Sequence, residues 1–566
     1  MARPVDTTRP IATLLDLLDD AVARFGDRPA FAIRHEGAET DGWTYAEFAR
    51  RTKVAAIRLR ALGLEPGDRV LTWSPSTPEL PATYFGAMRA RIVYVPLDLR
   101  MSKDAIEGIV RSSGARRLIA GSGRDAPDPK EFGLGGFPTT SVEYLGGPPD
   151  GDASLPVDWE EQVDGWPRPK PEDLVQLIFT SGTTGTPKGV MLAHDNLVAA
   201  NRSFHNIVPP MEHRIVSLLP LSHLLEQAVG VFYAISVGAS VLYVRSRNPR
   251  VIFDALREHR VTSMVVVPQV LDLFWSAIER EVEKSGRAKL FGVLRSVARR
   301  LPMALRRLLF RRVHAQLGGS FRLFVSAGAF LPPALQQAWE DMGVTVLQGY
   351  GATETGTGSS TTLQDHGLGT VGWAPEGIEM RLAPDGEVQF RGPSLFKGYW
   401  QAPEKTAAAY TDDGWYMTGD VGHFDTAGRL VLSGRSRDMI VLPNGFNVYP
   451  EDIENALRIA GLRDTVVLET KPGRIEAIVL PPSASPVRTA GEPLDFDPAS
   501  PPPELRATLD AAVRAANQSL GANQHISGWR LWPDSDFPRT HTLKVKRDLV
   551  RGWVSGAEAA GGGGTG

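Results

Sequence analysis

Residues 177 to 189 read "LIFTSGTTGTPKG", an apolar run that breaks into a loop of glycine and threonine around one lysine. The apolar run at 177–179 is typical of a buried strand. Glycine costs backbone entropy and threonine is stiff at its β-branch, so the segment from Thr180 to Lys188 is poor material for a helix or a packed strand. The pattern therefore predicts a strand that ends in a loop shaped to wrap around a ligand.

This loop carries the groups that bind phosphate. Lys188 supplies a positive charge, and glycine N–H groups in a concave loop donate to anions. The pattern of the nucleotide-binding P-loop is not met, because Pro187 precedes Lys188 and Gly189 follows it, so a GTPase-type site is disfavoured. Taken alone, the loop is either a phosphate site or a surface turn. The candidate donors are Thr180, Ser181, Gly182, Thr183, Thr184 and Gly185.

Strands and helices alternate on both sides of this loop. Residues 13–25 have the apolar spacing of a helix, and 29–34, 69–75 and 91–98 read as short strands. The same rhythm returns between residues 215 and 351. Strands that alternate with helices predict an α/β fold with parallel, doubly wound sheets, arranged as two related halves of one large domain.

The pattern changes near residue 380. Alternating strand patterns with the tight turns "PDGE" and "TAGR" predict a β-rich subdomain, and the helix predicted from Pro450 opens a smaller α+β unit. Residues 481–504 are rich in Pro and Ser and predict an exposed insertion. Residues 556–566 end in "GGGGTG" and predict a flexible tail.

The composition is that of a globular protein. The 566 residues carry a net charge of -3, which disfavours general attraction to nucleic acid. The chain has no cysteine, which excludes disulfides, thiolate metal sites and a cysteine nucleophile. Acids interrupt the apolar residues of the N-terminal stretch, which does not resemble a signal peptide. The expected location is the cytoplasm.

Residues 280–322 stand apart because arginines lie among apolar residues at roughly helical spacing. A basic amphipathic helix pair binds an anionic membrane surface or a polyphosphate ligand, and the other interpretation is a solvated insertion. Periodicity alone leaves both open. The arginines are Arg295, Arg299, Arg300, Arg306, Arg307, Arg311 and Arg312.

Further motifs follow the loop in a definite order. They are "QGYGATETG" at 348–356, "YMTGDVG" at 416–422, "LSGRSRDMIVLPNGFNVYPEDIE" at 432–454 and "FPRTHTLKVKR" at 537–547. With the loop, they resemble the signature motifs of the adenylate-forming enzymes, a superfamily of acyl-CoA synthetases, peptide-synthetase adenylation domains and luciferases. The resemblance covers about residues 175 to 547. It implies an AMP-binding N-terminal domain at 1–436, with a β-rich subdomain, and a mobile C-terminal domain at 437–566.

The resemblance implies a two-step reaction. A carboxylate attacks the α-phosphorus of ATP and releases pyrophosphate, and a thiol then captures the acyl adenylate, with ATP, Mg²⁺ and CoA as the implied cofactors. Because an anion approaches a polyanion, cations and oriented donors must offset the charge. Residues 180–188 would hold the β- and γ-phosphates, Thr353 would contact the α-phosphate, and Glu354 would hold Mg²⁺.

Other matched positions complete the implied nucleotide site. Tyr350 and Gly351 would lie on one side of adenine, and Asp420 would accept from the ribose hydroxyls with help from Arg435. Lys544 would reach both the carboxylate and the α-phosphate during adenylation. The segment that would line the other side of adenine is Gly328, Ala329 and Phe330.

The same family turns its C-terminal domain about a hinge, which matches Arg437 here. Asp or Lys is more usual at that position, and an exposed Arg tolerates rotation as Lys does. After rotation, Gly445 would let the thiol arm pass close to the backbone.

The stretch "LLPLSHLLEQ" at 218–227 resembles that of long-chain fatty acyl-CoA synthetases. It implies His223 near the reacting carboxylate and Glu226 beside the metal and phosphates. Leu543, where Gly is common, and the basic insertion also resemble that branch. The implied substrates are a long apolar fatty acid, ATP and CoA. Two alternatives stay open: a fatty acyl-AMP ligase that loads an acyl carrier protein, and a non-catalytic acyl or nucleotide sensor.

Overall fold

The computed structural model describes residues 11–35, 40–123, 125–150, 152–180, 187–209, 211–246, 248–444, 446–462, 464–481, 496–539 and 545–561. The chain divides into two compact units. The larger comprises Met1–Arg381, Gln389–Met417 and Thr426–Leu430, and the smaller comprises Leu382–Val388, Thr418–Asp425 and Val431–Gly566. The division expected from the motifs, after residue 436, stays a prediction.

The larger unit contains an eight-stranded sheet of order β14-β13-β12-β11-β9-β10-β1-β2. All pairs from β13 to β1 are parallel, and β14 and β2 are antiparallel edges. The predicted strand at 29–34 is confirmed as β1. The strands are β1 (Pro29–Arg34), β2 (Thr40–Thr44), β9 (Arg214–Ser217), β10 (Ser240–Val244), β11 (Ser263–Val266), β12 (Leu323–Ser326), β13 (Thr345–Tyr350) and β14 (Ser359–Ser360).

A second sheet of the larger unit has six strands in the order β6-β5-β3-β4-β7-β8. Its pairs are parallel except β7 with β8, which form an antiparallel hairpin. The strands are β3 (Arg69–Trp73), β4 (Val93–Pro96), β5 (Arg117–Ala120), β6 (Thr139–Ser141), β7 (Leu174–Thr180) and β8 (Lys188–Ala193). The two mainly parallel sheets confirm the predicted α/β class.

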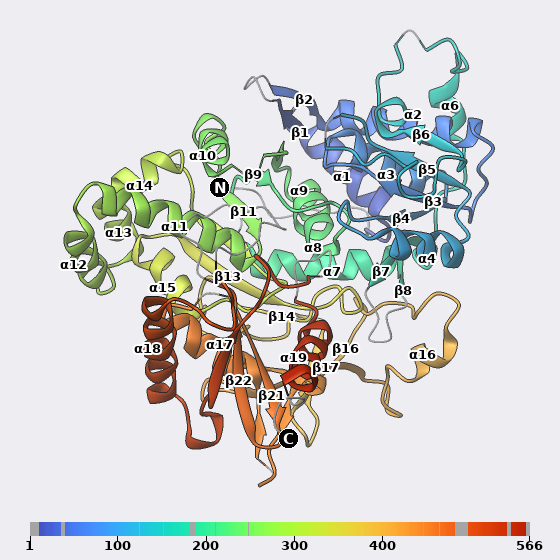
Figure 1. Cartoon of the computed structure of the whole chain (residues 1–566). Coiled ribbons are helices and arrows are strands. Elements are labelled where there is room, and N and C mark those ends of the chain that lie inside the picture. Colours follow the sequence, from blue (N-terminus) through green and yellow to red (C-terminus); the bar gives the residue numbers. More distant parts are fainter. Residues whose placement is uncertain are drawn as a thin grey trace. The chain divides into compact units, whose positions relative to one another are not determined.

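Helices connect these strands. The predicted N-terminal helix is confirmed as α1. A reciprocal cap starts this helix: the Thr13 hydroxyl accepts from the Asp16 N–H, and the Asp16 carboxylate accepts from the Thr13 N–H. In Figure 1, α12, α13 and α14 form the left margin, beyond α11 and α15. The helices are α1 (Leu14–Phe25), α2 (Tyr45–Ala61), α3 (Glu79–Arg89), α4 (Lys103–Ser113), α5 (Val142–Leu145), α6 (Trp159–Asp164), α7 (His194–Ile207), α8 (Leu224–Gln227), the π-helix η1 (Ala228–Tyr233), α9 (Ala234–Val237), α10 (Pro249–Glu258), α11 (Pro268–Lys284), α12 (Ala288–Ala298), α13 (Met303–Leu309), α14 (Arg311–Gln316), α15 (Pro333–Asp341) and α16 (Pro403–Ala407).

Each sheet has its own apolar core. Val266, Phe324 and Trp339 belong to the cluster that packs α11 and α15 on the eight-stranded sheet. Trp73 and Leu177 belong to the cluster on the six-stranded sheet, together with the apolar residues of α4. Burial of each such side chain stabilises the fold by about 1.5–3 kcal/mol, which holds the strand ends and their loops in fixed positions.

A four-stranded sheet has the order β15-β16-β17-β18, and the boundary between the units falls within its strands. Gly386 and Gly428, in the predicted turns "PDGE" and "TAGR", have positive φ values of 86° and 81°. The two predicted hairpins are therefore confirmed. The strands are β15 (Glu379–Leu382), β16 (Glu387–Arg391), β17 (Tyr416–Phe424) and β18 (Leu430–Arg435).

The rest of the smaller unit is α+β, as predicted. Its three-stranded sheet has the order β21-β22-β23, and α17 begins at Pro450 with Glu451 and Asp452 in its first turn. The elements are η2 (Ser436–Asp438), β19 (Ile440–Val441), β20 (Asn447–Val448), α17 (Pro450–Ile459), β21 (Thr465–Lys471), β22 (Arg474–Val479), α18 (Pro503–Ser519), η3 (Ala522–Gln524), β23 (Gly528–Leu531) and α19 (Arg547–Gly561).

Two expected boundaries differ from the structure. α18 begins at Pro503, inside the predicted insertion, because proline is well suited to the first helical position. α19 continues to Gly561, where a tail was expected, because the alanines of "GAEAAG" favour helix over the glycines. Within the described ranges, no helix is both long and apolar enough to cross a membrane.

Candidate active site

Thr180 and Lys188 are the paired ends of the β7–β8 hairpin. A Cβ atom at Gly189 would lie 3.0 Å from the Phe179 ring and 3.1 Å from Cβ of Trp400, so this glycine lets two chain segments approach closely. The hairpin therefore presents the predicted phosphate loop from a strand end. The predicted donors Ser181, Gly182, Thr183, Thr184 and Gly185 lie outside the described residues.

A tyrosine that the sequence analysis did not single out joins two predicted site residues. Nζ of Lys188 lies 4.9 Å from the ring centre of Tyr399, and Oη of Tyr399 donates to Oε1 of Glu354 at 3.1 Å. The Tyr399 segment is fixed because the Trp400 N–H donates to the Gly189 carbonyl at 2.7 Å. Lys188 and Glu354, from different motifs, thus share one neighbour. The only signal in the sequence was the aromatic pair in "KGYW".

Tyr399 lies in a group of buried and half-buried tyrosines around Glu354. Burial and the charge of Glu354 raise the pKa of Tyr399 above its ordinary value and raise the pKa of Tyr410 to about 12. Burial and the same charge also raise the pKa of Tyr416. The three hydroxyls stay protonated at neutral pH and remain available as donors.

Other predicted residues lie at the carboxyl ends of neighbouring parallel strands. His223 follows β9, the segment at 328–330 follows β12, and Tyr350 ends β13. Gly328 has a φ of 84°, which turns the chain sharply, and Phe330 is 42% exposed. The turn after Tyr350 contains an exposed Gly351 and a half-buried Thr353. In α/β sheets this edge is where ligands bind.

His223 is held by an acid that the sequence analysis also missed. Nε2 of His223 lies 2.8 Å from Oδ2 of Asp98, which is 1% exposed at the end of β4. Burial alone would raise the pKa of Asp98, but hydrogen bonds from His223 and Arg100 outweigh it and hold that pKa well below its usual range. The ionised Asp98 favours the tautomer with hydrogen on Nε2. Asp98 is the last residue of the segment 91–98 that was predicted to be a strand, two residues after the end of β4, and an acid at that position was the available signal.

Glu226 is buried against the π-helix. A Cβ atom at Gly230 would lie 2.5 Å from its Oε1, so the close approach depends on glycine. Neither carboxylate oxygen reaches hydrogen-bonding geometry with a partner in the described chain. Burial raises the pKa of Glu226 to about 8, and the nearby Ser217 hydroxyl offsets this only in part. Within the same residues no cluster of three His, Cys, Asp or Glu is assembled, so the predicted metal role of Glu226 stays a prediction.

The buried Glu226 carboxyl predicts a pH dependence of stability. Its folded pKa of about 8 lies above the ordinary 4.5, so between these values the folded state keeps a proton that the unfolded state releases. Its contribution to stability is therefore full below about pH 4.5 and is lost as pH rises through about 8. Because glutamine carries no ionisable proton, Glu226→Gln should be more stable than the wild type above pH 8, by on the order of a few kcal/mol.

Thermal unfolding from pH 6 to 9 measures this difference. The control is Glu172→Gln, since Glu172 is an exposed acid. A wild type and Glu226→Gln that lose stability in parallel across this range would contradict the buried, protonated carboxyl.

The two predicted ribose residues lie together in the smaller unit. Nε of Arg435 lies 3.2 Å from Oδ1 of Asp420, across neighbouring strands β18 and β17. The Asp420 N–H donates to the Thr418 hydroxyl at 3.1 Å, which orients the turn. Arg437, the predicted hinge residue, is half exposed. Lys544 and Gly445 lie outside the described residues.

A second acid group lies beside this pair. Glu454 and Arg547 form a 2.7 Å ion pair, and Glu451 packs over Gly434. Burial raises the pKa of Glu451 to about 7; Arg547 opposes that rise, and neighbouring acids, Asp420 among them, add to it. The side chains that follow the matched hinge motif are thus coupled electrostatically to Asp420.

The fold and these loops define an α/β protein with a candidate ligand site at the carboxyl edge of its sheets. Residues 18–400 match the family described as "AMP-binding enzyme". This match covers more than half of the chain, and the chain belongs to that family.

Named relatives cover three quarters of the chain or more. The long-chain-fatty-acid–CoA ligase FadD15 of Mycobacterium bovis is 31% identical over 93% of this chain and 93% of its own. A feruloyl-CoA synthase of Amycolatopsis sp. is 29% identical over 76% of this chain and 80% of its own. Relatives of similar sequence identity are thus named for different acid substrates.

Solved structures share the fold. ATP-bound MatB from Rhodopseudomonas palustris is 22% identical, with a TM-score of 0.73, over 96% of this chain and 99% of its own. A fatty acyl CoA synthetase of Mycobacterium tuberculosis is 22% identical, with a TM-score of 0.64, over the same shares. These likenesses confirm the predicted fold class.

Proposed function

We propose that this chain activates a fatty acid with ATP, releases pyrophosphate, and transfers the acyl group from the adenylate to CoA. The observation that carries the proposal is the alignment with FadD15, a relative named as a long-chain-fatty-acid–CoA ligase, over 93% of both chains. The site supports it, because residues from three matched motifs lie at strand ends where ATP and an acid can meet.

The phosphates of ATP would lie against the β7–β8 hairpin. Lys188 supplies a cation and Thr353 a hydroxyl for oxygens on which charge accumulates as pyrophosphate leaves. Glu354 is 9% exposed and Oε1 accepts from Tyr399, which leaves a buried, oriented carboxylate of the kind that suits Mg²⁺. Glu354, with Glu226, would hold that ion, which neutralises phosphate charge when bound.

The nucleoside would lie at the edge formed by β12 and β13. Tyr350 and the exposed Phe330 offer aromatic faces for adenine, and Gly328 to Ala329 bring backbone close to it. Asp420 accepts hydrogen bonds from ribose hydroxyls, with Arg435 holding its carboxylate. Lys544 would complete the adenylation step as the cation shared by the acid and the α-phosphate.

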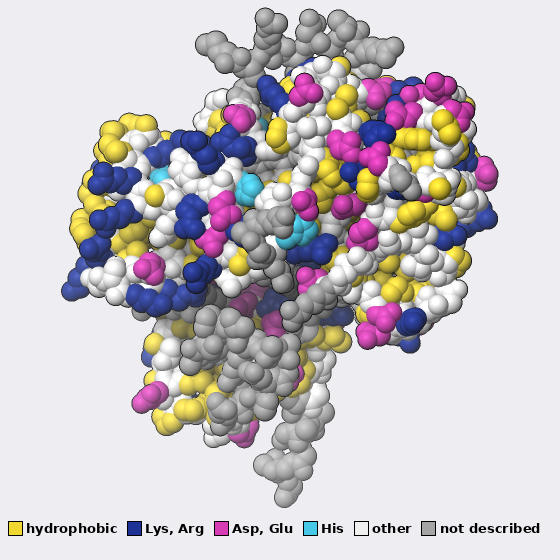
Figure 2. All heavy atoms as spheres, turned by 90° about the horizontal axis from the view of Figure 1, so that it is seen from above, with side chains coloured by type: hydrophobic (Ala, Val, Ile, Leu, Met, Phe, Trp, Pro, Cys, Tyr) yellow, Lys and Arg dark blue, Asp and Glu magenta, His cyan; other side chains and the backbone are white. Residues whose placement is uncertain are grey.

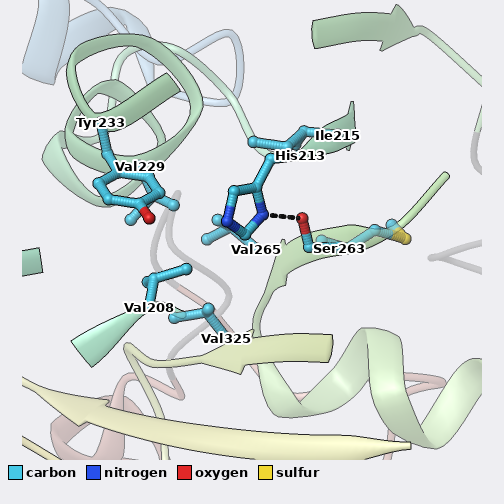
Figure 3. Close-up of a pocket in the computed structure, with 9 residues that line it drawn as sticks. Val208, His213, Ile215, Val229, Tyr233, Ser263, Val265 and Val325 are labelled. Atoms are coloured by element: carbon cyan, nitrogen blue, oxygen red, sulfur yellow. Dashed lines mark hydrogen bonds between the residues drawn. The ribbon is translucent and has the colours of Figure 1, made fainter. Parts of the chain in front are cut away.

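The acid's carboxylate would lie at His223. Helix α8 follows His223 and continues into η1, and Val229 and Tyr233 of η1 line a small apolar cavity. π-Helical turns often occur at functional sites. Figure 3 shows the lining side chains, with Nδ1 of His213 2.9 Å from Oγ of Ser263. The remaining labelled lining residues are Val208, Ile215, Val265 and Val325. Its volume of about 10 Å³ is room for about one water molecule, so this cavity does not hold an acyl chain in this structure.

The test is pyrophosphate release from ATP and Mg²⁺ with a panel of fatty, aromatic and short acids, without and then with CoA. We expect release with long fatty acids and acyl-CoA after CoA is added. Discharge of the adenylate by an acyl carrier protein but not by CoA would favour the acyl-AMP ligase instead. Absence of release with every acid would reject catalysis and favour a sensor.

Asp98 yields a prediction for the acid half of the site. An amide at this position donates to His223 as readily as it accepts, so Asp98→Asn weakens the preference for one imidazole tautomer. We expect acid-dependent pyrophosphate release to fall roughly 10- to 100-fold, the range for loss of a hydrogen bond to a charged group. The KM for ATP should stay unchanged.

The matched control is Ser222→Ala, because the Ser222 hydroxyl contacts the same oxygen of Asp98 at a longer 3.4 Å. Thermal unfolding of both variants distinguishes a loss of activity caused by misplacing His223 from one caused by destabilising the fold. A Asp98→Asn protein with normal acid kinetics would reject the positioning role of Asp98.

A further inference from the structure

Helices α12 and α13 are apolar on more than the face that packs on the protein. Phe291 and Leu294 of α12 contact the core, with the Phe291 ring 6.0 Å from Trp275 and 5.6 Å from Phe310. Leu290, Val293 and Val297 repeat at three- and four-residue intervals on the same helix and are 55%, 59% and 48% exposed. A surface helix normally has charged residues there, so this outward stripe needs another explanation.

α13 extends the exposed apolar surface. Leu305, Leu308 and Leu309 are 48%, 66% and 36% exposed. α12 and α13 contact each other, so the two sets belong to one part of the larger unit. We call these six side chains the apolar rim. Contiguous exposed apolar side chains mark a site of association with a protein or a membrane.

The same segment has a one-sided charge. From residue 284 to residue 322 the chain has eleven Arg and Lys and no Asp or Glu, although its net charge is -3. Figure 2 shows dark-blue and yellow side chains together along the left margin, where Figure 1 has α12 to α14. A positive surface beside the apolar rim is therefore local to this insertion.

The structure separates the arginines into two groups. Arg295 and Arg299 lie 3.2 and 3.0 Å from Oδ2 of the buried Asp341 in α15, and the Arg307 guanidinium donates to the Gly343 carbonyl at 2.8 Å. The Arg306 guanidinium donates to the Glu340 carbonyl at 2.9 Å. These four arginines hold the insertion on α15 rather than serving only a solvated face.

The second group is exposed and has no carboxylate partner among the residues that the structure describes. Its members lie before, within and after the apolar rim in the sequence. They are Arg287, Lys289, Arg300, Arg311 and Arg312. Exposed cations beside exposed leucines match the two parts of an anionic bilayer surface, its headgroups and its acyl boundary.

We propose that α12 to α14 form a docking surface for an anionic lipid bilayer, with the apolar rim inserted at the acyl boundary and the second group of basic side chains at the headgroups. A nucleic acid would use the cations but would leave six apolar side chains exposed to water. An anionic bilayer provides headgroups for the cations and an acyl boundary for the apolar rim. The inference does not depend on the proposed function, since it concerns binding alone.

Co-sedimentation of the full chain with vesicles tests this proposal. Phosphatidylcholine vesicles with phosphatidylglycerol should bind the protein, and vesicles of phosphatidylcholine alone should bind it at least about 10-fold more weakly, because each surface cation adds about one factor of five. Binding should weaken from about 0.1 M to about 1 M salt, as the Debye length falls from about 10 Å to about 3 Å.

Two variants separate the apolar and charged contributions. Leu290→Gln with Leu308→Gln, and Arg311→Gln with Arg312→Gln, should each lower binding to anionic vesicles about 10-fold or more. All four sites are exposed and glutamine favours helix, so thermal unfolding should match the wild type. The matched controls are Val157→Gln, a fully exposed apolar residue, and Arg111→Gln with Arg250→Gln.

Three results would overturn the proposal. They are equal binding to neutral and anionic vesicles, wild-type binding by both double variants, and equal losses in the controls. Retention of an RNA homopolymer by the wild type with no binding to anionic vesicles would instead assign the surface to nucleic acid.

Discussion

Replacement of Lys544 by alanine is expected to lower acid-dependent pyrophosphate release by about 100-fold or more, the effect of removing one preorganised donor to developing charge. The reason is electrostatic. In the proposed adenylation step the acid's carboxylate meets the α-phosphate of ATP. Lys544 is the cation that the matched motif assigns to both of these anions. Thioester formation from supplied acyl adenylate and CoA should change little, because that step has no attack on the α-phosphorus.

Lys546→Ala is the matched control, since Lys546 is a nearby exposed lysine whose N–H donates to the Pro538 carbonyl at 2.7 Å. Its backbone contact survives truncation to alanine, so the local fold should be kept. Equal loss of both half-reactions in Lys544→Ala would refute the assigned role. A large loss in Lys546→Ala would attribute the effect to the segment rather than to one side chain.

Local patterns predicted much of the architecture. The strand at 177–179, the helix at 13–25 and the helix that begins at Pro450 each depend on residues adjacent in sequence, and the structure confirms all three. Turn glycines such as Gly386 likewise act through their own backbone angles. These features need no knowledge of distant segments.

The missed residues depend on distant segments. Tyr399 matters because it forms an isolated antiparallel bridge with Val190 of β8, and Asp98 because β4 ends near the loop that carries His223. No local pattern marks either residue, since an aromatic residue after a turn and an acid after a strand are common. The basic insertion shows the converse: its spacing was visible, but only the contacts with Asp341 and with the Glu340 and Gly343 carbonyls divide its arginines into two roles.

Glu354→Gln tests the link, through Tyr399, between Glu354 and Lys188 of the β7–β8 hairpin. Glutamine keeps an oxygen for the Tyr399 hydroxyl, and the Phe396 N–H donates to the backbone carbonyl of residue 354, so the fold should be retained. The negative charge is lost, and with it the proposed ligand of Mg²⁺. We expect pyrophosphate release to fall roughly 100-fold or more, with partial recovery at high Mg²⁺, since metal stabilisation of transferring phosphate is worth several kcal/mol.

Tyr399→Phe removes the hydroxyl that donates to Glu354 and also hydrogen-bonds with Tyr416. It keeps the ring beneath Lys188, because a cation lies over a phenyl face as it does over a phenol. Its loss should be about 10-fold, the lower end for a hydrogen bond to a charged group. In the double variant the effect of Tyr399→Phe should largely disappear, because the hydroxyl acts through the carboxylate charge. Additive losses in pyrophosphate release would mean that Tyr399 and Glu354 act independently, and the bridge from Lys188 to the metal ligand would then have no part in catalysis.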